Sequence, residues 1–177
     1  MEKSTGTVAR LTRLGDTSLI VHWCTAEHGW IKTVAKGART RKSRFAGKLD
    51  LFFDAEIDWV RPKRGELAIL RDAALLETRS SLRTDWVAFL AAGYFVRLLE
   101  RAVEPEHPVP ELHDLLVRAL DYLARSGATR RAVEHYESEL ARLLGIGGGN
   151  RAPSTALAES LGGLPRGRDE LFGKLRR

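Results

Sequence analysis

Apolar and polar residues alternate through much of the first 78 residues. The alternation is clearest in residues 51–60, where every second residue is apolar and the residues between are mostly acidic. Four more β-rich runs lie between Gly- and Asp-containing turns, at residues 7–15, 17–25, 30–37 and 66–78. A further turn is predicted at residues 61–65. Five short strands predict a small, partly open antiparallel barrel of the oligonucleotide/oligosaccharide-binding (OB) type, with an SH3-like barrel as the alternative.

After about Ser81 the apolar residues recur at helical spacing. Three amphipathic stripes are predicted to form helices, within residues 86–99, 112–123 and 133–144. Prolines or glycines separate the stripes, and three such helices joined by short loops predict a bundle. The predicted fold class is therefore α+β, an N-terminal OB-fold β-barrel followed by an all-α helical domain.

The chain is predicted to have three parts, at residues 1–80, 81–146 and 147–177. Residues 145–154 hold four glycines and indicate a flexible linker. Their "GIGGG" lacks the Gly-Lys-Ser/Thr end of a phosphate-binding loop. Beyond the linker, apolar residues suit short helices, and the pattern leaves open whether these dock or remain mobile.

Positive charge is concentrated in the barrel part. Residues 1–72 hold 14 Lys or Arg against 9 Asp or Glu, a net +5, whereas the rest of the chain holds 15 against 14, a net +1. Seven positive residues and no negative one lie between Lys32 and Lys48. Such a field favours polyanions such as nucleic acid.

The basic segment supplies the candidate nucleic-acid site. Glycines at its borders and small residues within it allow a phosphate to approach the main chain. Trp30 and Phe45 flank the charges and are candidates for base stacking, with burial in the core as the alternative for each. If about five side chains neutralise phosphates on a single strand, log affinity should fall with log salt at a slope near −3.5, so a fourfold rise in salt weakens binding roughly a hundredfold. The candidate cations are Lys32, Lys36, Arg39, Arg41, Lys42 and Arg44, with Arg13 and Arg10 on a neighbouring strand.

No catalytic, metal or cofactor site is predicted. The five histidines are scattered without a metal-binding spacing, and alternate acidic residues at 54, 56 and 58 are typical of a solvated strand face. Cys24 lies in an apolar run and is expected to be a small buried side chain. With no apolar leader at the N-terminus and no run of roughly 18 apolar residues, a cytoplasmic, nucleoid-associated protein without a membrane segment is expected.

Linked motifs in residues 15–53 resemble the RecO family of recombination mediators. They are "GDTSL" at 15–19, "TAEHG" at 25–29, "AKGAR" at 35–39, "SRFAGKL" at 43–49 and the aromatic pair at 52–53. "RGELAILRDAALLE" from Arg64 and "AVEHYESELARLLGI" from Ala132 resemble the family's last barrel strand and a later helix. The similarity extends over about residues 5–146.

The resemblance implies a DNA repair and recombination mediator that anneals complementary single strands without ATP and helps to load recombinase. Its implied partners are single-stranded DNA, with double-stranded DNA as a further candidate, RecR, the acidic C-terminal tail of single-stranded DNA-binding protein, and RecF as a further partner. Many family members carry a four-cysteine zinc module, but no cysteine follows Cys24 here, so a short form without that module is expected. Candidates for binding the acidic tail are Arg97, Arg101, Arg130 and Arg131 on the predicted helices.

Two other functions compete with this one. An OB-fold RNA- or DNA-binding regulatory module without mediator activity is the alternative, and strand annealing separates the two. A nuclease finds little support, because the sequence offers no metal cluster or nucleophile dyad.

Overall fold

The computed structural model describes residues 1–62, 67–147 and 150–175. The chain forms two compact units, one built from Met1–Thr78 and Glu104–His113, and one from Arg79–Val103 and the residues after His113. The predicted division at residues 80 and 146 stays a prediction. The predicted turn at 61–65 lies largely outside the described residues, as do Gly148 and Gly149 of the predicted linker. In the described part of the chain, no helix combines the length and apolarity that crossing a membrane requires.

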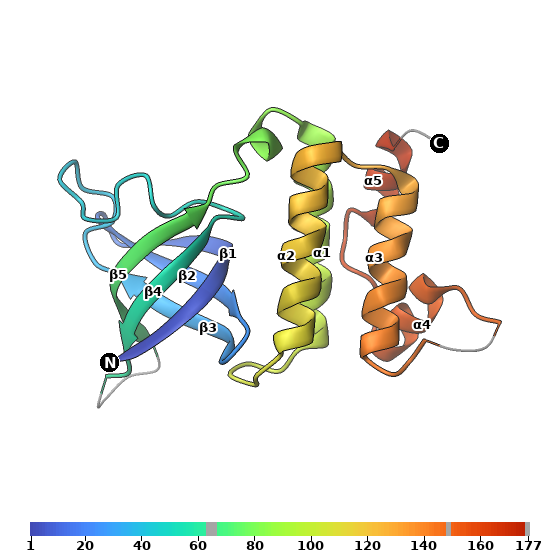
Figure 1. Ribbon diagram of the computed structural model, residues 1–177, viewed down its shortest axis with the longest axis horizontal. Coiled ribbons are helices and arrows are strands. Elements are labelled where there is room, and N and C mark those ends of the chain that lie inside the picture. Colours follow the sequence, from blue (N-terminus) through green and yellow to red (C-terminus); the bar gives the residue numbers. More distant parts are fainter. Residues whose placement is uncertain (63–66, 148–149, 176–177) are drawn as a thin grey trace. The chain divides into compact units, whose positions relative to one another are not determined.

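Five strands close into a barrel in the order β1-β2-β3-β5-β4 (Figure 1). Its strands are β1 (Glu2–Leu14), β2 (Ser18–Thr25), β3 (Gly29–Ala35), β4 (Asp54–Val60) and β5 (Ala68–Glu77). This confirms the predicted five-stranded barrel of an α+β protein. The prediction of a partly open, antiparallel barrel is wrong in two respects, because the barrel is closed and because β3 and β5 pair in parallel. A closed ring with an odd number of strands cannot alternate direction throughout, so one neighbouring pair must be parallel.

The barrel encloses one apolar core. Phe53, Ala55, Ile57 and Trp59, which the alternating pattern places on one face, all belong to it. The predicted strand is shorter than expected at its start, since Phe52 has a φ of 67° and β4 begins only at Asp54. Burying a large apolar side chain contributes about 1.5–3 kcal/mol, so these alternate residues account for much of the barrel's stability.

The segment Glu104–His113, which links two helices and includes the first turn of the second, packs on the barrel. The Glu106 amide donates to the Trp30 carbonyl at 3.2 Å, and the Val109 amide donates to the Ala26 carbonyl at 3.0 Å. Gly29, with a φ of 60°, allows this approach, because a Cβ there would lie 2.1 Å from the carbonyl oxygen of His107. A connection that the pattern shows only as a Pro-containing break is therefore part of the barrel unit.

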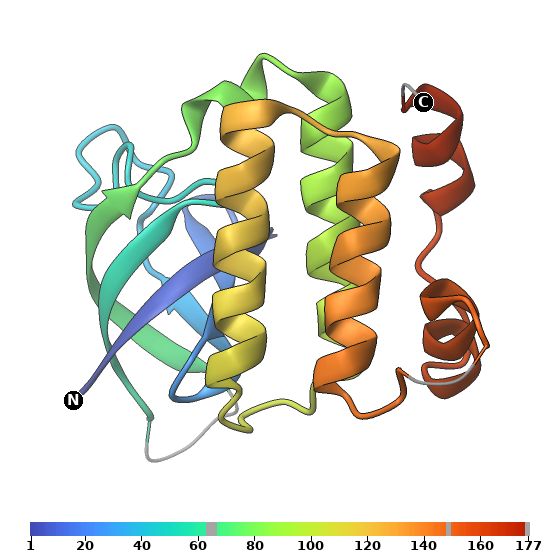
Figure 2. The same ribbon diagram turned by 45° about the vertical axis from the view of Figure 1, so that its right-hand side comes forward.

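The second unit is helical, which confirms the predicted change of period. Asp85 begins α1 by accepting hydrogen bonds from two amides of the first turn, and Thr129 caps α3 in the same way. Helices α1, α2 and α3 run side by side (Figures 1 and 2). The described helices are α1 (Trp86–Ala102), α2 (Pro110–Ser126), α3 (Arg130–Leu143), α4 (Pro153–Ser160) and α5 (Arg168–Lys174), with a short 3-10 helix at Ser80–Arg83.

The two last helices dock within the helical unit, which settles the question that the pattern leaves open. Helix α4 contacts α3 and helix α5 contacts α1. Arg168 donates from Nε and Nη2 to the carboxylate of Glu137 at 2.7 and 2.9 Å, and the Tyr94 hydroxyl donates to Glu137 at 2.6 Å. Glu137 is only 1% exposed. Burial, with the neighbouring Glu137 carboxylate, raises the pKa of Tyr94 and so keeps its hydroxyl protonated as a donor.

Candidate nucleic-acid interface

The basic segment forms an ordered loop between β3 and β4, which we call the basic loop, residues 36–53. Successive turns build it, since the amides of Thr40, Ser43, Ala46 and Lys48 each donate to the carbonyl three residues earlier at 3.0–3.2 Å. Gly37 and Gly47 have φ values of 68° and 72°, which the glycine-bordered pattern anticipates. The loop is therefore a chain of hydrogen-bonded turns.

Phe45 anchors the middle of the basic loop. Its ring is 4% exposed and belongs to the barrel core. Its backbone amide is also bonded within the loop, because it donates to the Ser43 hydroxyl at 3.1 Å. This corrects the expected stacking role of Phe45: the core alternative holds, because a ring buried under the loop presents no face to a base.

Two arginines of the basic loop bond to main-chain carbonyls of neighbouring elements. Arg39 donates from Nη1 to the carbonyl of Asp16 at 2.8 Å, and Arg44 donates from Nη1 to the carbonyl of Arg71 at 3.2 Å. Carbonyl groups carry no net charge, so both guanidinium groups keep their full positive charge. The loop is thereby attached to the β1–β2 turn on one side and to β5 on the other.

Lys36, Arg41 and Lys42 point their charges into solvent. Each is exposed, and within the described residues none of the three has a side-chain hydrogen bond or an ion pair. Lys48 differs, because its ammonium group lies 3.4 Å from the carboxylate of Asp72. The backbone amide of Ala73, with Lys48, lowers the pKa of Asp72, so this loop cation is matched by a carboxylate.

The other predicted cations lie on the strands. Arg13, on β1, is exposed near the β1–β2 turn, opposite Leu19 in the strand register. Arg10, His22 and Lys32 are direct neighbours across β1, β2 and β3, so they share one face of the sheet. His22 was not among the predicted residues, and only the strand register reveals that it lies between two cations.

Trp30 does not lie with the basic loop. It is at the start of β3, whereas the loop begins where β3 ends, and its indole is 9% exposed. It lines a cavity of about 310 Å³ together with Arg61 and Lys32. Arg61 is 2.8 Å from Glu106 and 3.3 Å from Glu2, so carboxylates already match its charge. The stacking role expected of Trp30 is therefore not supported by its burial or its position.

Burial extends to every Phe and Trp ring of the described barrel residues. None is more than 9% exposed. Base stacking needs an accessible ring face, so the described barrel offers charge to a nucleic acid and no Phe or Trp face for stacking. The six rings are those of Trp23, Trp30, Phe45, Phe52, Phe53 and Trp59.

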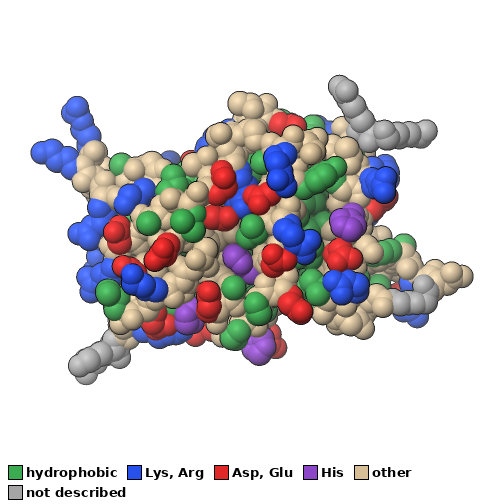
Figure 3. Space-filling view, in the orientation of Figure 1, with side chains coloured by type: hydrophobic (Ala, Val, Ile, Leu, Met, Phe, Trp, Pro, Cys, Tyr) green, Lys and Arg blue, Asp and Glu red, His purple; other side chains and the backbone are tan. Residues whose placement is uncertain are grey.

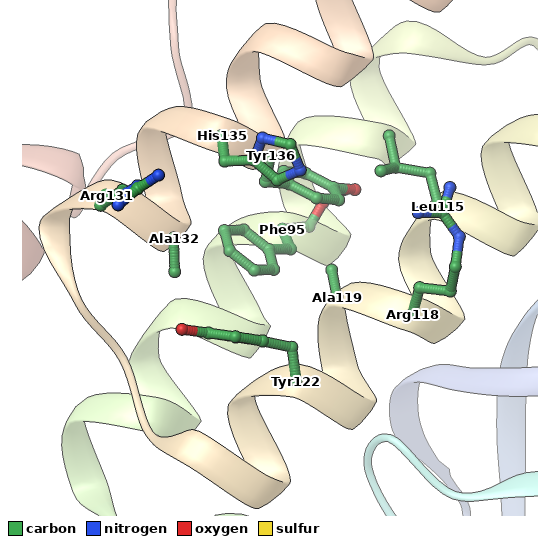
Figure 4. A pocket seen from close by; sticks show the side chains of 9 residues that line it. All are labelled: Phe95, Leu115, Arg118, Ala119, Tyr122, Arg131, Ala132, His135 and Tyr136. Carbon is green, nitrogen blue, oxygen red and sulfur yellow. The ribbon is translucent and has the colours of Figure 1, made fainter.

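The helical unit holds an apolar groove of about 370 Å³ between α1, α2 and α3 (Figure 4). Phe95, Tyr122 and Tyr136 supply aromatic walls. Its cationic or titratable lining residues are Arg118, Arg131 and His135. Arg118 and His135 were missed, although Arg118 precedes Tyr122 by one helical turn and His135 follows Arg131 by one turn, a spacing that places each pair on one helix face.

Only one of the four arginines predicted to bind a partner lines this groove, and it is Arg131. Arg101 donates to the carbonyl of Gly163 at 2.8 Å, and Arg130 stacks over Phe172 of α5 at 4.6 Å. Arg97 lies against Gly93 and Gly167. These three lie against residues in the range 163–172, so the structure does not bring the four predicted arginines together at one site.

Two family profiles match successive parts of the chain. Residues 1–79 match the family profile described as "Recombination protein O N terminal", and residues 83–149 match "Recombination protein O C terminal". The DNA repair protein RecO of Syntrophotalea carbinolica is 29% identical over 159 residues, which is 84% of this chain and 62% of that protein. The protein of that name from Listeria monocytogenes is 31% identical over 146 residues, 82% of this chain and 56% of the relative. The chain thus spans about three fifths of the length of the curated relatives it matches.

Proposed function

Because the chain belongs to the RecO family of DNA repair and recombination proteins, we propose that its barrel binds DNA through the basic loop, anneals complementary single strands without ATP and assists recombinase loading. The observation that carries this proposal is the exposure of Lys36, Arg41 and Lys42 on a loop that is otherwise held in place. Figure 3 shows Lys and Arg side chains gathered along the left-hand edge, over the barrel.

Phosphate binding without stacking suits annealing. Two single strands repel each other through their phosphates, and cations that neutralise both chains lower this repulsion. Since no Phe or Trp ring of the described barrel is exposed, the bases of a bound strand remain free to pair with a complement. This mechanism needs positioned charge and no catalytic group.

The test is a charge-reversal series in the basic loop. Arg41→Glu and Lys42→Glu should each weaken binding to a single-stranded oligonucleotide and reduce the magnitude of the salt slope by about 0.7 or more. Annealing of complementary labelled oligonucleotides should slow in step with binding. Lys3→Glu is a matched control, because Lys3 already lies 3.6 Å from Asp58 on the barrel. Equal losses in the control and the loop variants would refute the assignment of the site.

Annealing also distinguishes the main alternative. A regulatory RNA- or DNA-binding module would bind oligonucleotides with the same salt dependence and leave annealing unaccelerated. The assay is therefore run with DNA and RNA strands, with and without cognate single-stranded DNA-binding protein. Degradation of labelled DNA only with Mg²⁺ or Mn²⁺ would instead revive a nuclease.

We further propose that the groove of the helical unit receives the acidic, Phe-ended tail of single-stranded DNA-binding protein. Phe95, Tyr122 and Tyr136 form an apolar wall for an aromatic side chain. Arg131 supplies a charge for acidic residues of the tail, whereas Arg118 is already paired with Asp114 at 2.7 Å. Interaction with RecR, and with RecF as a further partner, is proposed on the family relationship alone.

Fluorescence anisotropy with a labelled tail peptide tests the groove. Arg131→Glu should weaken binding by about tenfold or more, since truncating or reversing one charged contact costs more than about 1.4 kcal/mol. Arg142→Glu is the control on the same helix, because Arg142 pairs with Glu139 and does not line the groove. Equal binding by both variants would refute the assignment.

A further inference from the structure

The basic loop contains two structurally different kinds of cation. Arg39 and Arg44 donate to main-chain carbonyls of other elements, whereas Lys36, Arg41 and Lys42 have no side-chain bond within the described residues. A side chain that holds the loop in place and one that reaches a phosphate respond differently to substitution. The distinction is therefore open to experiment.

Arg39 ties the first half of the loop to the β1–β2 turn. Its amide donates to the Thr17 carbonyl at 2.8 Å, and its Nη1 lies 2.8 Å from the Asp16 carbonyl and 3.5 Å from that of Gly15. The Gly37 amide adds a bond to the Ser18 hydroxyl at 3.3 Å. A planar guanidinium group can face two carbonyls from a fixed direction, which the compact ammonium of lysine reproduces poorly.

Phe45 and Arg44 fix the second half. The Arg44 guanidinium bonds to the Arg71 carbonyl of β5, and the next residue places its ring in the barrel core. Arg41 and Lys42 lie between the two attachment points at Arg39 and Arg44. Their backbone is thus held from both sides while their side chains stay in solvent.

We propose that Arg39, Arg44 and Phe45 are positioning residues that pre-organise the basic loop, and that Lys36, Arg41 and Lys42 make its phosphate contacts. The proposal rests on the proposed DNA binding and divides its site into two roles. A loop ordered before binding does not lose further conformational entropy when the DNA arrives, which strengthens binding without adding a contact.

The two roles predict different salt slopes. Three phosphate contacts correspond to a slope near −2 on a single strand, so a fourfold rise in salt weakens binding about twentyfold. Five contacts would give a slope near −3.5. Loss of a phosphate contact lowers the magnitude of the slope by about 0.7, whereas loss of a positioning contact weakens binding and leaves the slope unchanged, because the freed loop still reaches the same phosphates.

Charge-preserving variants give the sharpest comparison. Arg39→Lys keeps its charge and loses the fit to two carbonyls, so affinity for a single-stranded oligonucleotide should fall about tenfold, the equivalent of ordering one or two residues on binding. Arg142→Lys is the charge-preserving control, because Arg142 lies on α3, pairs with Glu139 at 3.0 Å and is outside the proposed DNA site, so this variant should bind as the wild type does. Phe45→Leu should behave as Arg39→Lys, since leucine keeps an apolar anchor of smaller size where alanine risks unfolding the barrel.

A second readout needs no DNA. The loop holds several Lys and Arg residues, so trypsin cleaves it as soon as the loop is free to move. Wild type and Arg142→Lys should be cut slowly there, and Arg39→Lys and Phe45→Leu should be cut faster while their thermal unfolding remains cooperative. Mass spectrometry locates the cleavage after residues 41 and 42.

The outcomes separate the two proposals. Equal affinity and equal cleavage for Arg39→Lys and Arg142→Lys would overturn the positioning role, as would a wild-type slope near −3.5 that falls by about 0.7 in Arg39→Ala. A wild type that shows no salt-dependent binding would overturn the proposed DNA site. Even then the trypsin comparison would still decide whether Arg39 and Phe45 position the loop.

Discussion

Removing Arg168 should destabilise the helical unit far more than removing an exposed arginine does. Arg168 makes two hydrogen bonds, at 2.7 and 2.9 Å, to the carboxylate of Glu137, which is 1% exposed. Each hydrogen bond to a charged group contributes about 1.5–3 kcal/mol, so Arg168→Met should cost roughly 3–5 kcal/mol. The cost arises mainly because Glu137 is left as a buried charge whose one remaining partner among the described residues is the Tyr94 hydroxyl.

The same structure predicts that the cost disappears when the polar cluster is replaced as a whole. A triple variant with Tyr94→Phe, Glu137→Leu and Arg168→Met leaves no buried charge and no buried hydroxyl without a partner. Its free energy of unfolding should lie within about 1–2 kcal/mol of the wild type, since well-packed apolar groups often replace a buried ion pair without loss. In that case the three polar side chains satisfy one another's hydrogen bonds and add little to the net free energy of unfolding.

Urea unfolding followed by far-ultraviolet circular dichroism measures these differences. Arg142→Met is the control, because Arg142 pairs with Glu139 at 3.0 Å on the surface and should contribute less than about 1 kcal/mol. If Arg168→Met costs no more than this control, Glu137 is not held as a buried charge. If the triple variant is as unstable as Arg168→Met, the reasoning about compensation is wrong.

Two further predictions concern the barrel. Burial, together with the charge of Asp54, raises the pKa of Cys24 from about 9 to about 12. The contribution of the buried thiol to stability is therefore complete below pH 9 and should be lost between about pH 9 and 12, which denaturation measured against pH would show. A thiol reagent near pH 8 should label Cys24 only after unfolding. Gly29→Ala should lower the free energy of unfolding by at least about 2 kcal/mol more than Gly47→Ala does. Both glycines have a positive φ, but of the two only Gly29 would bring a Cβ against a backbone atom, the His107 oxygen at 2.1 Å. Equal melting temperatures for the two variants would contradict this.

Residues of the strands and helices were predictable because local periodicity reflects which face is buried. The alternation in residues 51–60 identified Phe53, Ala55, Ile57 and Trp59 as core, and all four are buried. The alternation predicted a strand from residue 51, but the strand begins only at Asp54. The cause is local, because Phe52 has a left-handed backbone conformation that periodicity does not reveal.

The roles of single residues in the basic loop were less predictable. Phe45 lies among cations in sequence, where stacking and core burial are equally compatible with its neighbours. Only the fold brings the barrel core beneath it. Arg39 and Arg41 are likewise indistinguishable in sequence, and they differ because Arg39 faces the carbonyls of a turn more than 20 residues earlier.

The helical candidates show the same limit. Arg97, Arg101 and Arg130 were chosen for their helix spacing, yet they lie against residues that come much later in the chain. The groove itself depends on three helices meeting, so Arg118 and His135 could not be identified from any one helix.

Local patterns were enough to predict the succession of strands and helices, the excess of positive charge in the barrel part and the motifs shared with the RecO family, because each depends on residues close together in the chain. Three-dimensional contacts were needed to show which loop cations remain in solvent, that the barrel's Phe and Trp rings are buried, and that the segment Glu104–His113 belongs to the barrel unit. These facts depend on contacts between residues distant in sequence, and local patterns do not encode which distant surface a side chain will meet.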